Sequence, residues 1–195
     1  MEVELSAKAR EIVACARTLL TIGGYHSFSY ADISDAVHIS KPSIHHHFPS
    51  KAELVRTVVA VYREEARAGM AKLERHVPGP LEQLQGYTNF WATCIGARDS
   101  SFCVCAMLAA ELPTLPSEVS EGVRGHFVDL SEWLASLLSR GAAEGVFVLQ
   151  GSPRSEALAF MASVHGAMLS ARAHNDPELF AEILRPVLRR LTLPG

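Results

Sequence analysis

The chain has 195 residues, of which 48% are hydrophobic and 20% charged, a composition typical of globular proteins that excludes a disordered or fibrous chain. No apolar run reaches the roughly 18 residues that a membrane-spanning helix needs, and residues 1–10 are acidic and polar, so we expect a cytoplasmic protein without a membrane partner. The net charge of −3 is unevenly distributed, because residues 5–63 carry seven basic and four acidic side chains and the remainder of the chain is acidic. This distribution is expected when only the first segment approaches the phosphates of a nucleic acid.

Apolar residues repeat with a period near 3.6 along almost the whole chain, which predicts an all-α fold of about nine helices. The first helix is expected over residues 7–21, where Ile12, Ala16 and Leu20 share one face. The pair Gly23-Gly24 ends it, since glycine is favoured just after the last helical turn.

Two short helices follow the first one. Ser29 and Asp32 have the spacing of a capping box and open the second helix. Ser40 caps the third, in which Pro42 lies in the first turn and loses no needed hydrogen bond, and Pro49 ends it.

The tight segment 37–39 joins these two helices. Three helices in this layout match a helix-turn-helix motif, here about residues 29–48, whose second member enters the major groove of DNA. Ser50 and Glu53 form a further capping box that opens a long fourth helix toward His76.

The segment 77–80, Val-Pro-Gly-Pro, interrupts the helical pattern. We therefore expect the domain junction within or at the end of the fourth helix, with a DNA-binding domain over residues 1–62 and a regulatory and dimerisation domain over residues 63–195.

Five more helices are expected, over residues 81–97, 102–111, 118–144, 154–174 and 177–191. The helix over 154–174 carries a stripe of small residues that allows another helix to approach closely, and it consists of Ala159, Ser163, Gly166 and Ser170. The last two helices would form a four-helix homodimer interface with their copies. The alternative, that the stripe packs inside one protomer, stays open.

Residues 7–62 resemble the TetR family of bacterial transcription repressors. The resemblance rests on Gly24-Tyr25, on Ser29 and Ile33, and above all on residues 40–54, SKPSIHHHFPSKAEL. It implies a sequence-specific repressor that binds a palindromic double-stranded operator as a homodimer and is released by a small-molecule or thiol-reactive inducer. No cofactor is expected.

The residue types in the motif suit DNA, because hydroxyl, imidazole and ammonium groups can reach phosphates or base edges. Lys41, Pro42 and His46 are expected near base edges. The expected contacts to the phosphate backbone are Ser29, Tyr30, Ser40, Ser43, His45 and Lys51.

Two residues depart from the family pattern. His38 occupies the turn position where the family usually has glycine, so the turn either accepts a residue outside its preferred backbone region or differs in shape. His45 stands where the family usually has tyrosine. The run of residues 45–47, three histidines, does not predict a metal site, since successive helical side chains point about 100° apart.

An apolar pocket with one polar group is the first candidate for a sensor in the second domain. Ordinary core packing is the alternative for each of its members, which are Phe90, Trp91, Phe102, Met107, Trp133, Phe160, Met161, His165 and Met168.

Cys103 is the second candidate. Residues 102–112 resemble the start of helix six in the electrophile- and oxidant-sensing repressors of the NemR type, and Cys103 matches their reactive cysteine. A thiol at a helix N-terminus is expected to have a lowered pKa. Cys94 or Cys105 would be the resolving partner.

Two functions from other classes remain as alternatives. One is a thiol-dependent enzyme with Cys103 as nucleophile and His126 or His165 as base, but no orienting residue or oxyanion motif accompanies it. The other is a metal-responsive regulator that uses Cys103, Cys105 and histidine residues, although no second ligand pair stands at a fixed spacing.

Overall fold

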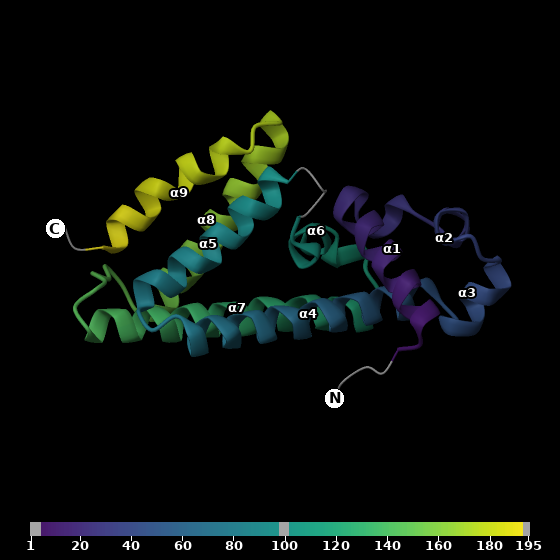
Figure 1. Cartoon of the computed structure of the whole chain (residues 1–195), viewed down its shortest axis with the longest axis horizontal. Coiled ribbons are helices and arrows are strands. Elements are labelled where there is room, and N and C mark those ends of the chain that lie inside the picture. The colour runs from purple at the N-terminus through teal and green to yellow at the C-terminus, as the bar shows by residue number, and fades with distance from the viewer. Residues whose placement is uncertain (1–4, 98–101, 193–195) are drawn as a thin grey trace. The chain divides into compact units, whose positions relative to one another are not determined.

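A computed structural model describes residues 5–97 and 102–192 of the chain (Figure 1). These residues contain nine α-helices, two short 3-10 helices (η1 and η2) and no β-strand, which confirms the predicted all-α fold. The elements in chain order are α1 (Ala7–Gly23), η1 (Tyr25–Ser27), α2 (Tyr30–Val37), α3 (Lys41–His47), α4 (Lys51–His76), α5 (Pro80–Gly96), α6 (Val104–Ala109), η2 (Leu112–Thr114), α7 (Ser117–Ala143), α8 (Pro153–His174) and α9 (Glu178–Leu191).

The helix boundaries lie close to those expected, with α6 as the exception. This helix was expected over residues 102–111 and instead spans Val104–Ala109. It begins late because Cys103 is its N-cap. It ends early because Pro113 has no N–H with which to continue the helical hydrogen bonds, and the Glu111 N–H donates to Leu108 O at 3.0 Å as the chain turns into η2.

The described residues pack into two compact units. The first contains residues 5–66 and 102–127, and the second contains residues 67–97 and 128–192. Both α4 and α7 begin in the first unit and end in the second. The functional domain boundary expected at residue 62 stays a prediction.

The core of the first unit is built by one face of each helix. Ile12 and Leu20 of α1, Ile33 of α2 and Ile44 of α3 are all fully buried. The short helices α2 and α3 depend on this burial, because helices of seven or eight residues are marginal in water by themselves.

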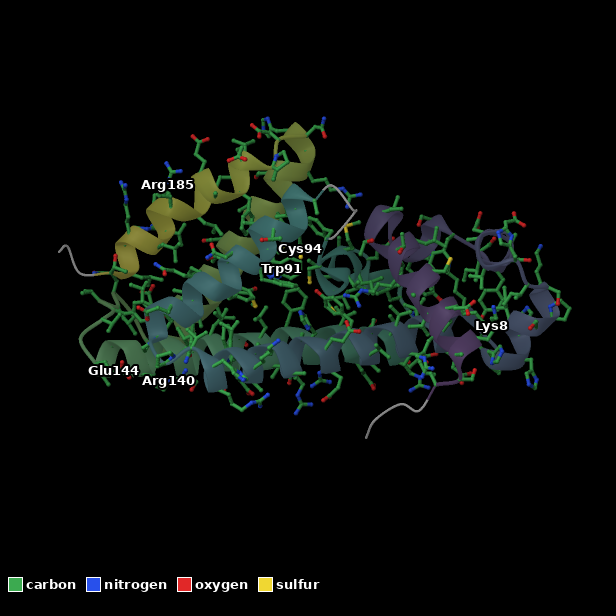
Figure 2. All side chains as sticks on the ribbon, in the orientation of Figure 1. Lys8, Trp91, Cys94, Arg140, Glu144 and Arg185 are labelled. Carbon is green, nitrogen blue, oxygen red and sulfur yellow. The ribbon has the colours of Figure 1, made fainter. Side chains whose placement is uncertain are left out.

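The second unit is held together mainly by α8 and α9, which pack along each other (Figure 1). Phe160 of α8 and Phe180 and Leu184 of α9 are almost completely buried. At its surface the guanidinium of Arg140, labelled in Figure 2, donates to Gln83 Oε1 at 2.8 Å. None of the helices searched, all within the described residues, is long and apolar enough to cross a membrane.

Candidate nucleic-acid interface

The third helix presents a polar face because its opposite face is anchored. The Ser43 N–H donates to the hydroxyl of the N-cap Ser40 at 3.3 Å, and Pro42 occupies the first turn, where its missing N–H costs nothing. Ile44 is fully buried against the core. The side chains left exposed by this anchoring are Lys41, Pro42, His45 and His46.

The turn before this helix contains a left-handed residue. His38 has φ 54° and ψ 47°, which is the left-handed region. The turn therefore keeps its shape and accepts a histidine in a backbone region that this residue does not prefer. Two hydrogen bonds hold the segment: the Ile39 N–H donates to Ser34 O at 3.2 Å, and the Ser34 hydroxyl donates to Ile39 O at 2.6 Å. A non-glycine residue here costs roughly 1 kcal/mol.

The capping box of α2 is formed as the sequence predicts. The N–H and the hydroxyl of Ser29 both donate to Asp32 Oδ2, at 2.7 and 2.8 Å. These two hydrogen bonds, with that from the hydroxyl as the larger effect, lower the pKa of Asp32. The Ser29 hydroxyl is thus already engaged in the cap of α2. Its contact with a phosphate stays a prediction.

Tyr30 and Lys51 also make contacts within the first unit that the sequence did not reveal. The Tyr30 hydroxyl donates to Phe48 O at 2.8 Å, and burial raises the pKa of Tyr30 to about 12. The Lys51 ammonium donates to Phe28 O and lies 4.0 Å from the centre of the Phe28 ring. Both side chains hold the ends of the motif together, and their contacts with phosphates stay predictions.

Glu111 joins the segment after α6 to the end of α1. The Tyr25 N–H donates to Glu111 Oε2 at 2.6 Å, and Gly24 has φ +83°. A methyl group added at Gly24 would lie 2.7 and 2.8 Å from the two carboxylate oxygens of Glu111. The next contact along this segment joins His26 Nε2 and Thr114 Oγ1 at 3.2 Å. Sequence reasoning missed this connection, since its partners lie more than 80 residues apart.

The environment of Cys103 contradicts the expected reactivity. The residue is the N-cap of α6, and its Sγ accepts from the Ala106 N–H at 3.4 Å. However, the side chain is fully buried, 3.9 Å from His126 Nε2, and burial raises the pKa of the Cys103 thiol more than the hydrogen bond with Tyr62 lowers it. The prediction of a lowered pKa was therefore wrong, because it considered the helix end and not the desolvation.

Burial also raises the pKa of the neighbouring Cys105 thiol. Cys94 is half-buried and belongs to the second unit, whereas Cys103 and Cys105 belong to the first. No group of three or more potential ligand side chains that could hold a metal ion is found in residues 5–97 and 102–192.

The residues expected to line a pocket are divided between the two units. Phe102 and Met107 belong to the first. The second unit contains Trp91 on α5, Trp133 on α7, and Met161 and His165 on α8. Within this unit the ring of Trp133 lies 5.6 Å from the ring of Tyr87.

Comparison with known proteins identifies close relatives. A family model described as bacterial regulatory proteins of the tetR family matches residues 12–58. A solved structure of a TetR-family transcriptional regulator from Agrobacterium tumefaciens shares 55% identity, with 96% of this chain and 98% of that chain covered and a TM-score of 0.94.

Two further matches are more distant. The HTH-type transcriptional regulator CymR of Pseudomonas putida is 31% identical over 137 residues, which span 67% of this chain and 66% of the relative, just under two thirds of its length. The reduced form of NemR from E. coli has a TM-score of 0.84 at 16% identity, with 97% of this chain and 100% of that chain covered. At that identity the likeness shows a shared fold alone.

Proposed function

Because this chain belongs to the TetR family of bacterial regulatory proteins and carries that family's helix-turn-helix domain, we propose that it is a sequence-specific repressor. It acts in the cytoplasm, binds a palindromic operator as a homodimer, and leaves the DNA when a small molecule binds to the protein.

The exposed face of α3 carries this proposal. Lys41 lies at the first helical position and is exposed, as are Pro42 and His46. With α3 in the major groove, the Lys41 ammonium can reach guanine acceptors, and Pro42 and His46 would lie beside other base edges. Phosphate contacts from the remaining polar residues of the motif position the helix. They carry no sequence information themselves.

The homodimer is supported by the exposed face of α8. This face lacks charged side chains between Glu156 and Arg172, and Gly166 leaves open space in which a helix can approach. Its exposed residues are Leu158, Ala159, Ala162, Gly166, Leu169 and Ala173. We propose that α8, together with α9, forms a four-helix interface with the partner protomer, which sets the half-sites about 34 Å or more apart.

A small molecule that enters the second unit is the inducer we favour over a thiol-reactive one. Cys103 is fully buried and its thiol is held in the neutral form by desolvation. An electrophile would reach it only after α6 opens, so the thiol route is the second candidate.

Fluorescence anisotropy on DNA from upstream of the gene that encodes the protein tests repression. We expect saturable, salt-sensitive binding that Lys41→Ala weakens by about tenfold at unchanged thermal stability, since a good base contact contributes about 1–3 kcal/mol. Lys72→Ala is the control, because it removes an equal charge from an exposed position outside the motif. Equal weakening by both substitutions would contradict base recognition by α3.

A further inference from the structure

The only two tryptophans of the chain, Trp91 and Trp133, both lie in the second unit. Their exposed fractions are 8% and 9%, and neither indole N–H meets a hydrogen-bond acceptor among the described residues. More than nine in ten buried polar groups in native proteins are satisfied, and an unsatisfied one costs about 1–3 kcal/mol. Two such donors in one unit therefore require an explanation.

The two indoles belong to a single aromatic cluster. Tyr87 and Trp91 are one turn apart on the buried face of α5, and the ring of Tyr87 lies 5.6 Å from that of Trp133 on α7. Figure 2 labels Trp91 on α5. The donors thus come from two helices that meet at Tyr87, which is an arrangement that can hold one molecule from two sides.

The surroundings of the cluster carry no buried charge in the described part of this unit. Its buried polar side chains are Gln83 and Thr88, and both have partners within the protein. Burial lowers the pKa of His165 to about 4, so that imidazole is neutral at physiological pH. An anion placed here would be desolvated without a counter-charge, at a cost that an uncharged acceptor avoids.

From these observations we propose that the interior of the second unit, at Tyr87, Trp91 and Trp133, binds an uncharged, mostly apolar molecule through a carbonyl or similar neutral oxygen that accepts from the indole N–H groups. The aromatic rings supply the apolar contact, and the two donors supply the orientation. The inference rests on the proposed function in that this molecule would be the inducer, but binding to the protein alone does not require DNA.

The test compares three molecules of nearly equal size: acetophenone, which is neutral with an acceptor; benzoate, which is an anion; and ethylbenzene, which has no acceptor. The full-length protein is labelled with ¹⁵N-tryptophan, so that the two indole N–H groups give two resonances, which Trp91→Phe and Trp133→Phe assign. Titration calorimetry gives the affinities. Phe90→Leu, which changes an exposed ring beside Trp91 without removing a donor, is the control.

We expect acetophenone to shift both indole resonances and to bind more tightly than the other two, by roughly 3- to 10-fold for each hydrogen bond formed. Each Trp→Phe variant should lose part of this preference, and Phe90→Leu should keep it. Benzoate binding as tightly as acetophenone, a preference that survives both Trp→Phe substitutions, or no binding of any of the three would overturn the proposal.

The two proposals fail separately. Selective acetophenone binding by a protein that recognises no operator would contradict repression and leave the binding site standing. Operator binding with no selective response at the indoles would contradict the binding site alone.

Discussion

Replacing Gly24 by alanine tests the connection between α1 and the segment after α6. Gly24 has φ +83° and ψ −170°, a backbone region that is essentially restricted to glycine, and an alanine there costs about 1–3 kcal/mol. The new methyl group also displaces the Glu111 carboxylate from the Tyr25 N–H, and a hydrogen bond to a charged group contributes about 1.5–3 kcal/mol. We expect the free energy of unfolding to fall by about 3–5 kcal/mol.

Urea unfolding followed by circular dichroism, at one fixed protomer concentration, measures this change. Gly145→Ala is the matched control, because Gly145 has φ +73° and no atom within 4 Å of the added methyl group. It should cost only the backbone strain, about 1–2 kcal/mol. Equal losses in the two variants would refute the reasoning, because they would show that Glu111 contributes nothing at this turn.

Three further predictions concern the cysteines, acid stability and dimerisation. Iodoacetamide should modify Cys94 at least about tenfold faster than Cys103, because burial raises the pKa of Cys103 and shields it. Mass spectrometry after timed quenching measures the rates at both cysteines. Faster labelling of Cys103 would make a thiol-reactive inducer the first candidate again. As pH falls from about 6.5 to about 4, the unfolded state binds a proton at His165 before the folded state does. The free energy of unfolding of the wild type should therefore fall by about 3 kcal/mol over this range, and that of His165→Gln should not show this loss. Parallel profiles of the free energy of unfolding against pH for the two proteins would contradict this. Leu169→Glu should convert the dimer to monomer in size-exclusion chromatography with light scattering, whereas Ile22→Glu, which changes a similarly exposed apolar residue of the first unit, should not. A dimer that persists in Leu169→Glu would argue for a different interface.

Most of the fold was predictable because the helix ends are fixed by neighbouring residues. The capping residues Ser29, Ser40, Ser50 and Ser152 each accept a hydrogen bond from the first turn of the helix that follows. Such hydrogen bonds depend on residues two or three positions apart, which a sequence displays directly.

The contacts that organise the candidate site were not predictable in this way. Lys51 reaches Phe28 across 23 residues, Tyr30 reaches Phe48 across 18, and Tyr25 reaches Glu111 across 86. The lysine and the tyrosine looked like free polar groups of a DNA-binding motif, because their partners are backbone carbonyls that no sequence pattern marks. Burial was equally hidden, and the prediction for the Cys103 pKa was wrong for this reason.

The first unit is discontinuous along the chain, and this determines the order in which it is completed during synthesis. Residues 5–66 leave the ribosome well before residues 102–127, which supply the partners of Tyr25 and Tyr62. A nascent chain that ends before Glu111 therefore has α1, α2 and α3 without the carboxylate that secures the turn after α1. The DNA-binding motif would reach its final stability only when about two thirds of the protein has been made, so a nascent or truncated chain should compete poorly with finished protein for the operator.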